Sequence, residues 1–467
     1  MALRPPVNHQ ILISNTDEWR ENSVPLNIHL YSYQQPVRDA VSNLYNRLYR
    51  ELTIAEELTY DIPEDKFYVK SLPRTEGRQK NTNQILNMIV MNCYHRYLTS
   101  NGHGSIGVSF DNNKYTKKSR YNAIGVTRTT LHDVYNALCD SGYLYSRKAT
   151  PGSTNNISSR FSATEELIEF LQSYDINPNM IEEYSETEVI EITEKIIDGR
   201  GVERKIYHEY DDTDTTHLMR ADLHRYKNHL KAQTIECTTY TQFTKVDTYR
   251  AKRVFNNETD FSLGGRIYAG FWQNMPSEHR QNIVLNGQRT VELDYINCQL
   301  KILYALEDEF YQEDGYILDG YQDNIGRDLL KKVLLIALNT PSKNSAVAAF
   351  NTWMGENRQK RNEVYNYYVE RDIRPGRLID QFTDKHEKLN HHFFTESGLS
   401  IMRIDSDICM SIINKFIEMD KPILTIHDSF VVTEQDEELL RQTMKSQFEL
   451  HTQIEIDNVD ALIKKEN

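Results

Sequence analysis

The sequence predicts an α+β protein, in which a mostly helical N-terminal part precedes a C-terminal half built from antiparallel strands and helices. Two observations favour this fold class. In the N-terminal half, residues 85–98 form a largely apolar segment long enough for a buried helix. In the C-terminal half, the alternating residues 290–295 are followed directly by helical spacing over 298–306, and residues 422–432 show an apolar strand–turn–strand pattern.

The composition indicates a globular protein and argues against several classes. The chain has 467 residues, 39% of them hydrophobic and 26% charged, which is enough for a large core and for about three domains of ~150 residues. No run of ~18 apolar residues is present, so no membrane-spanning helix is expected, and the N-terminus does not resemble a secretory signal. Five widely spaced cysteines argue against a disulfide framework or a Cys-x-x-Cys zinc site and favour a reducing compartment. We therefore expect a cytoplasmic protein with no membrane partner.

Positive charge is concentrated in one part of this acidic chain. The formal net charge of −14 argues against a nucleic-acid partner, but residues 66–160 hold fourteen Lys and Arg against four Asp and Glu. Residues 162–200 show the reverse, with eleven acidic and two basic side chains. Because affinity for phosphates depends on local charge, the basic block, which includes Lys117 and Lys118, is a candidate nucleic-acid-binding surface. The alternative is a solvated basic face without a partner.

Residues 120–165 carry a pattern that resembles a winged helix. Apolar residues over 131–138 share one helix face, and a glycine then ends the helix before a short strand at 143–145. The polar run 150–159 contains a proline and a glycine, which suits a hairpin tip, and a return strand is expected at 159–162.

Two polar residues would lie at the exposed start of this helix. Thr127 and Arg128 precede its apolar positions, where a recognition helix enters a major groove. The alternative is that the module contacts another protein. The basic charge around it favours nucleic acid.

Composition divides the chain into four segments. They are an N-terminal helical region (1–65), a basic winged-helix-like domain (66–165), an acidic helical connector (166–205) and a C-terminal domain (206–467).

Three segments of the C-terminal half carry residues suited to catalysis. Asp294 lies where a strand ends and a helix begins. Arg327 and Lys331 are four residues apart on one helix, so their side chains project from the same face. His427 and Asp428 form the tight turn of an apolar hairpin. Taken singly, each has an ordinary explanation, namely a helix cap, a solvated helix face and a simple turn.

Together, two carboxylates at strand ends and two cations on a helix suit metal-assisted phosphoryl transfer. Mg²⁺ prefers hard oxygen ligands and shares substrate phosphates. Two such ions about 3.5–4 Å apart can activate a hydroxyl and stabilise a leaving oxygen, while Arg and Lys neutralise the triphosphate.

In this order, the three segments resemble motifs A, B and C of family A nucleic-acid polymerases. Residues 294–301 (DYINCQLK) are similar to the motif A sequence of the DNA polymerases, and Arg327 and Lys331 match the R-x-x-x-K start of the fingers helix. Residues 427–430 (HDSF) match the form found in phage-type single-subunit RNA polymerases, whereas the DNA enzymes usually have His-Asp-Glu.

Further elements extend the resemblance over roughly residues 255–445. Gly265-Arg266 and residues 273–276 (QNMP) are similar to the T-G-R and Q-N-I-P elements of the DNA polymerases, and residues 402–412 resemble the helix before motif C. The resemblance implies a palm-and-fingers catalytic domain.

The resemblance also implies roles for individual residues. Asp294 and Asp428 would hold two Mg²⁺ ions, for which Mn²⁺ is an alternative, and the Tyr295 carbonyl would add a ligand. Arg327 and Lys331 would bind the incoming triphosphate, with Lys331 a proton donor to pyrophosphate. The remaining positions are Gln299 at the ribose gate, Asn339 beside the nascent base pair, His427 near the primer end, Arg266 on the template or primer backbone, and Gln273 and Asn274 as further nucleic-acid contacts.

Two departures bear on sugar choice. Asn339 stands where the family usually has the tyrosine that forms the floor under the nascent pair. Gln299 replaces a glutamate that blocks a ribose 2′-hydroxyl and is nearly isosteric with it. Gln299 and the QNMP element favour DNA synthesis slightly, whereas the HDSF form favours RNA synthesis.

Three hypotheses follow. The leading one is a template-directed nucleotidyltransferase that takes nucleoside triphosphates and a DNA template with a primer or an RNA product. An RNA polymerase or primase would use the same site. A hypothesis from another class is a DNA-binding replication initiator whose C-terminal half is an inactive polymerase fold. The architecture suggests a compact replication enzyme of a phage or mobile element in a bacterial cell.

Overall fold

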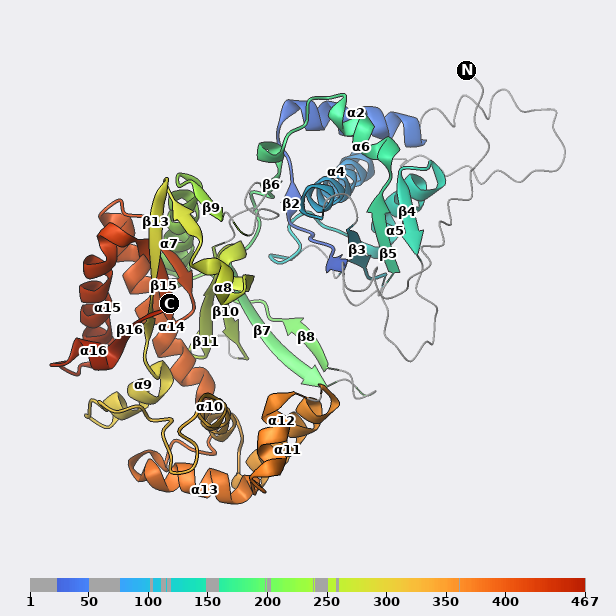
Figure 1. Ribbon diagram of the computed structural model, residues 1–467. Coiled ribbons are helices and arrows are strands. Elements are labelled where there is room, and N and C mark those ends of the chain that lie inside the picture. The colour runs from blue at the N-terminus through green and yellow to red at the C-terminus, as the bar shows by residue number, and fades with distance from the viewer. Residues whose placement is uncertain are drawn as a thin grey trace, which may run out of the picture. The chain divides into compact units, whose positions relative to one another are not determined.

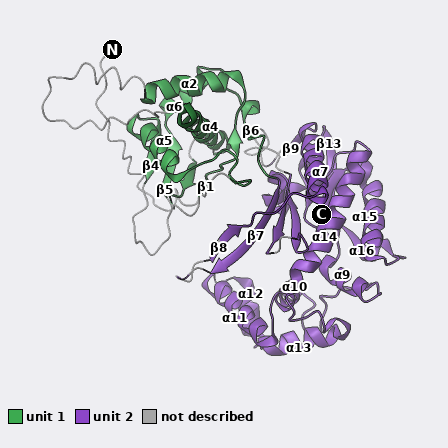
Figure 2. Cartoon of the chain, turned by 180° about the vertical axis from the view of Figure 1, so that it is seen from behind, with its two compact units in different colours: residues 1–188, 240–248 green, residues 189–239, 249–467 purple. Residues whose placement is uncertain are grey.

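A computed structural model gives the fold, which is α+β as expected and divides into two compact units (Figure 2). Unit 1 comprises residues 1–188 and 240–248, and unit 2 comprises residues 189–239 and 249–467. The division therefore follows residue 188, whereas the predicted boundary follows residue 205. Within these units the structure describes residues 23–49, 76–100, 104–110, 115, 119–147, 159–197, 199, 203–237, 239, 251–257, 260–360 and 362–466.

Unit 1 packs helices against a small mixed sheet. Its sheet has the strand order β1-β3-β5-β4, and β2 pairs separately with β6. The predicted buried helix is confirmed as α4, whose residues 85–94 are all buried and which contacts α2, α5 and several strands. The elements of unit 1 are β1 (Ser23–Pro25), β2 (Leu30–Tyr31), α2 (Gln35–Tyr49), α4 (Glu76–Thr99), β3 (Ser105–Val108), α5 (Arg128–Asp140), β4 (Leu144–Arg147), β5 (Ser159–Ala163), α6 (Glu165–Gln172) and β6 (Glu182–Glu183).

The helix, strand and return strand predicted over residues 131–162 are present as α5, β4 and β5. Strand β5 pairs antiparallel with both β4 and β3. Helix α5 begins after Thr127, whose hydroxyl accepts a hydrogen bond from the Thr130 backbone N–H at 3.2 Å. Gly142, with a φ of +79°, follows the helix end, where a left-handed conformation is needed.

The acidic segment is helical only in part, so the prediction of a helical connector over 166–205 is wrong beyond α6. Residues Ile190–Ile197 form strand β7, which pairs with β8 (Glu203–Tyr207) and with β10 (Lys252–Asn256). Its β-branched residues suit a strand. The acid Glu191 is balanced by cations on the two neighbouring strands, and its carboxylate accepts a hydrogen bond from Lys252 Nζ at 2.7 Å.

A six-stranded sheet forms the centre of unit 2. Strand β13 (Gln288–Tyr295) pairs antiparallel with β15 (Ser429–Thr433) along one edge, and with β12 (Ile283–Leu285) and the C-terminal β16 (Ile463–Glu466) along the other. Strand β14 (Leu424–Ile426) pairs with β15, and β9 (Ile235–Cys237) pairs with β12. A second sheet has the order β11-β10-β7-β8, with β11 at Gly264–Tyr268.

Helix α15 packs on the central sheet of unit 2, and the other long helices form further groups. Helix α14 contacts α7, α9, α15 and strand β11, whereas α10, α11, α12 and α13 contact one another in a separate group, drawn in yellow to orange in Figure 1. The helices are α7 (Asp214–Lys231), α8 (Ser277–Arg280), α9 (Cys298–Leu306), α10 (Asn324–Leu338), α11 (Lys343–Lys360), α12 (Glu363–Glu370), α13 (Pro375–Lys385), α14 (Gly398–Glu418), α15 (Glu437–Thr452) and α16 (Val459–Leu462). Among the described helices, none is both long and apolar enough to cross a bilayer.

A glycine lets strand β11 approach helix α14. Gly265 has a φ of +89°, and a Cβ placed there would lie 2.8 Å from the Ser406 hydroxyl and 2.9 Å from the Phe255 ring. The Gly265 carbonyl accepts a hydrogen bond from Arg253 Nε at 2.8 Å, and the same guanidinium donates to Ser406 Oγ at 2.9 Å. This close contact fixes the position of the next residue, Arg266.

We expect Gly265→Ala to destabilise unit 2 by more than the cost of its positive φ. An L-residue in the left-handed region costs about 1–2 kcal/mol, and overpacking adds about 1–3 kcal/mol. Gly287→Ala is the matched control, because Gly287 has a similar φ of +76° but open space around its Cα. Thermal unfolding of both variants measures the difference, and equal losses would show that the contact with α14 is unimportant.

Candidate active site

The structure brings together the two carboxylates predicted from separate segments. Asp294 is the penultimate residue of β13, and its register partner on β15 is Ser429, which follows Asp428. The Tyr295 backbone N–H also donates to the Asp428 carbonyl at 3.4 Å. Neighbouring strands thus hold both acids at the same end of the sheet.

Asp294 is not a helix cap. The N-cap residue of α9 is Asn297, and no side-chain cap hydrogen bond is made there. On β13, Val291, Leu293 and Tyr295 are buried, so alternation places the Asp294 side chain on the opposite face.

The two carboxylates disfavour each other's ionised form. Burial, and then the charge of Asp428, raises the pKa of Asp294 to about 7. Burial also raises the pKa of Asp428. One cation compensates in part, because Lys464 of β16 lies 3.2 Å from Asp294 Oδ2. A pair of half-buried carboxylates with incompletely balanced charge is a donor set that fits a hard divalent cation such as Mg²⁺.

A third carboxylate, Asp405, was not found from the sequence. It lies on α14 with 4% of its surface exposed, and its Oδ1 accepts a weak hydrogen bond from Cys298 Sγ at 3.8 Å. Burial and then the charge of Asp428 raise the pKa of Asp405 to about 7. A signal was present, because Asp405 falls on the buried stripe that includes Ile401 and Ile408, where an acid is unexpected.

Arg266 and His427 lie beside these acids. The Arg266 charge lowers the pKa values of both Asp405 and Asp428, although burial outweighs it. Its buried Nε has no hydrogen-bond partner among the described residues, and neither has the buried Nδ1 of His427. Burial, and then the Arg266 charge, lowers the pKa of His427 to about 4, so this imidazole is neutral at pH 7. His427 also has a φ of +59° and its ring meets that of Tyr268 edge-on.

Helix α10 carries the two predicted cations on one face, and Arg327 is held more tightly than expected. Its Nε donates to Asp314 Oδ2 at 2.8 Å and its Nη2 to Asn297 Oδ1 at 3.0 Å. Lys331 is exposed, and its charge lowers the pKa of Asp428 against the larger effect of burial. The sequence did not indicate Asp314 or Asn297 as supports for Arg327, because they lie on other segments.

The residues predicted at the ribose gate and beside the nascent pair lie on different helices. Gln299 is in the first turn of α9 and is half-buried. Asn339 is the exposed C-cap of α10, where its Nδ2 donates to the Leu335 carbonyl at 2.7 Å. A Cβ on Gly398, the first residue of α14, would lie 2.5 Å from Asn339 Oδ1, so this side chain packs against the start of α14.

Gln273 supports the hairpin that carries Asp428. Its Nε2 donates to the carbonyls of Ile267 and Thr425, both at 3.0 Å, and its Oε1 accepts from the Ala269 N–H at 2.8 Å. The Gln273 amide, which was predicted to contact nucleic acid, therefore makes its hydrogen bonds with the protein backbone. Asn274 beside it is exposed.

The remaining predicted residues belong to unit 1. Thr127 caps α5, and Arg128 Nε donates to the Phe110 carbonyl at 2.6 Å. Both side chains therefore already make hydrogen bonds within the protein. Lys117 and Lys118 lie outside the described residues.

Comparison of the sequence with models of known protein families gives no match, and comparison with curated proteins gives no significant match. Functional inference therefore depends on the geometry of the site.

We expect Asp405→Asn to change how stability depends on pH in the presence of a chelator. Because the pKa values of Asp294 and Asp405 are raised from 3.8 to about 7, the folded state binds more protons than the unfolded state between these values. The contribution of these two groups to the free energy of unfolding therefore decreases as the pH rises from about 4 to 7. The variant should gain stability relative to the wild type over that range.

The comparison with the wild type is essential, because the lowered pKa of His427 acts in the opposite direction in both proteins. Unfolding temperatures measured from pH 4 to 7 give the difference, and added Mg²⁺ should reduce it. A difference that does not vary with pH would contradict the assignment of a shared, charge-coupled site.

Proposed function

We propose that the protein is a metal-dependent, template-directed nucleotidyltransferase whose unit 2 is a palm-and-fingers catalytic unit similar to that of family A polymerases. The observation that carries this proposal is the meeting of Asp294 and Asp428 at one end of β13 and β15. The charge of Lys331, from α10, also acts on Asp428. The three sequence segments that resemble polymerase motifs therefore converge, which their spacing alone did not require.

In this proposal the carboxylates of Asp294 and Asp428 and the Tyr295 carbonyl hold two Mg²⁺ or Mn²⁺ ions. When bound, such ions lower the pKa of an attacking 3′ hydroxyl and stabilise charge on the leaving oxygen. Asp405, whose pKa is raised by burial and then by the charge of Asp428, adds a third carboxylate near the pair, which favours divalent over monovalent cations. The DNA polymerases have a glutamate after the motif C aspartate, where this chain has Ser429. The carboxylate of Asp405 partly compensates for the absence of that glutamate.

The cations of the site have separate tasks. The exposed ammonium of Lys331 binds the triphosphate and gives a proton to the departing pyrophosphate, since an ammonium on a flexible stem can follow the leaving group. Arg327, oriented by Asp314 and Asn297, binds a phosphate oxygen with the N–H groups that these two residues leave free. Arg266 and neutral His427 lie where the primer end would approach Asp428.

DNA synthesis is the favoured activity. Gln299, in the first turn of α9, is close in shape to the glutamate that excludes ribose in the DNA polymerases, and Gln273 belongs to a DNA-polymerase-like element. An RNA polymerase or primase, to which the HDSF sequence is similar, would use the same carboxylates and cations.

A nucleic-acid-binding role for unit 1 accompanies the catalytic proposal. The order β3-β5-β4, with α5 preceding the β4–β5 hairpin, is similar to a winged helix, and this unit contains the basic block. Binding of duplex DNA that weakens steeply with salt would be expected. If such binding occurs with no metal-dependent synthesis, the protein is a replication initiator with an inactive polymerase fold.

We expect Asp428→Asn and Asp294→Ala each to reduce nucleotide incorporation by at least about a thousandfold, because each removes a metal-binding carboxylate. The assay extends a primed DNA template with Mg²⁺ and either dNTPs or NTPs, alongside a reaction without primer. Asp384→Asn, which changes an exposed acid on α13, is the matched control and should keep full activity.

Each product pattern decides between the proposed activities. Extension with dNTPs alone supports a DNA polymerase, and products from NTPs without primer support a primase. Undiminished incorporation by the Asp428→Asn variant would refute the proposed site.

We expect Lys331→Ala to lower kcat/KM for the nucleotide by about 10²–10³-fold, because it removes a cation that acts on developing phosphate charge. Lys332→Ala is the control, since Lys332 lies next along α10 but points to the Trp353 ring, 5.4 Å from its Nζ. It should change kcat/KM less than about twofold. Equal effects of the two variants would mean that the helix contributes only general positive charge.

A further inference from the structure

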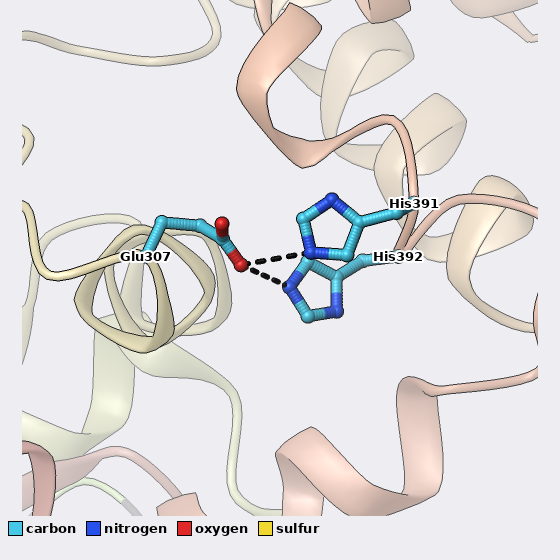
Figure 3. Close-up of side chains that lie close together, drawn as sticks. All are labelled: Glu307, His391 and His392. Atoms are coloured by element: carbon cyan, nitrogen blue, oxygen red, sulfur yellow. Dashed lines mark hydrogen bonds and ion pairs between the residues drawn. The ribbon is translucent and has the colours of Figure 1, made fainter.

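Two consecutive histidines and a glutamate converge away from the polymerase-like carboxylates. The Nε2 atoms of His391 and His392 both lie 2.9 Å from Oε1 of Glu307 (Figure 3). The two imidazole ring centres are only 4.1 Å apart. The ligand atoms that the three side chains offer all lie within 4.8 Å of one another.

The backbone around the histidines holds both rings in this arrangement. They follow a turn in which Leu389 is fully buried, and the next residue, Phe393, is 3% exposed. The His392 carbonyl accepts hydrogen bonds from the Thr395 and Ser397 hydroxyls at 2.8 and 2.9 Å. Consecutive side chains usually point apart, so a fixed turn that aims both Nε2 atoms at one oxygen is an unusual placement.

Glu307 is fixed as well. It is the C-cap residue of α9, and its backbone N–H donates to the Tyr304 carbonyl at 2.9 Å. Its carboxylate lies near the surface, with 27% of the side chain exposed, whereas the side chains of His391 and His392 are 60% and 19% exposed. Solvent can therefore reach the point where the three side chains meet.

We propose that Glu307, His391 and His392 form a site for a transition-metal ion of the Zn²⁺ type. Two imidazole nitrogens and one carboxylate oxygen are a recurring three-ligand set for Zn²⁺, with water in the fourth position. Imidazole ligands favour Zn²⁺, Co²⁺ or Ni²⁺ over Mg²⁺, which prefers an all-oxygen shell.

The two histidine–glutamate distances need to lengthen only slightly to admit the ion. Ligand bonds of about 2.0–2.1 Å in tetrahedral geometry place ligand atoms ~3.3–3.4 Å apart, compared with 2.9 Å between each Nε2 and Oε1 here. The ion would replace the two N–H protons that now point at Glu307, so binding releases protons or requires a change of tautomer.

A metal at this place would link two parts of the catalytic unit. Glu307 ends α9, whose first turn carries Gln299, and the histidines lie a few residues before α14, which carries Asp405. The ion would cross-link the end of α9 to the connection that enters α14. We therefore assign it a structural task, because the three residues belong to neither the carboxylate pair nor the cationic face of α10.

Zinc binding by the metal-stripped, full-length protein is the direct test. Competition with a chromophoric chelator, in excess Mg²⁺ to occupy the polymerase-like carboxylates, should show one tight Zn²⁺ equivalent per chain. Bound Co²⁺ should give the visible absorption of a four- or five-coordinate site. Zn²⁺ should also raise the unfolding temperature, because a ligand that binds only the folded state stabilises it.

Variants assign the binding to these residues. His391→Ala, His392→Ala and Glu307→Gln should each weaken Zn²⁺ binding by more than about tenfold, since even loss of a partner around a ligand costs about 10–100-fold. His217→Ala, at an exposed histidine of α7, should not change the affinity. Asp428→Asn should retain the Zn²⁺ equivalent while losing nucleotide incorporation, which separates this proposal from the proposed function.

Two outcomes would overturn the proposal. The first is absence of a Zn²⁺ equivalent in the presence of Mg²⁺, which would leave the cluster as an ion pair only. The second is wild-type affinity in a folded His391→Ala variant, whose substitution is at a largely exposed side chain, because the zinc would then bind elsewhere.

Discussion

The antiparallel pairing of β13 with β15 is the constraint on which the rest of the site depends. It places Asp294 next to the turn that carries Asp428, and every other group of the site is arranged around that pair. Strand β16 brings Lys464 to Asp294, the close contact at Gly265 sets Arg266 beside the acids, and α14 adds Asp405. A one-residue change of register would turn Asp294 to the other face of the sheet.

Charge balance explains why a divalent cation would stabilise such an arrangement. Two unit charges 4 Å apart interact by about 4 kcal/mol at an effective dielectric constant of 20. Lys464 offsets part of the repulsion among the carboxylates, yet the pKa values of Asp294 and Asp405 still lie near 7. Protonation relieves the remaining repulsion in the metal-free protein. Mg²⁺ would relieve it without neutralising the ligands, so occupation of the site and ionisation of its acids favour each other.

The sequence predicts the parts of this site that lie within one continuous segment. It does not predict the parts that depend on contacts between segments far apart in the chain. Alternation and helical spacing were sufficient for β13, α9, α10 and the β14–β15 hairpin, because each pattern is complete within its own segment. Lys464 could not be assigned, since its place follows from β16 pairing with a strand about 170 residues earlier. Asp405 required the direction of α14 relative to β13. The error at β7 has a similar cause, because its acid Glu191 is balanced by Lys205 of β8 and Lys252 of β10.

The energetics of the acids favour an enzyme over an inactive polymerase fold. Burying ionisable carboxylates beside one another is unfavourable unless a cation or proton compensates. Asparagine, serine or an apolar residue at position 294, 405 or 428 would remove that cost while keeping the strand pairing and helix contacts. A fold used only as a scaffold for DNA binding has no need of three acids whose pKa values are all raised. Electrostatic repulsion of this kind is expected where the charge has a chemical task, and in the proposed function that task would be to hold a divalent cation beside the cationic face of α10.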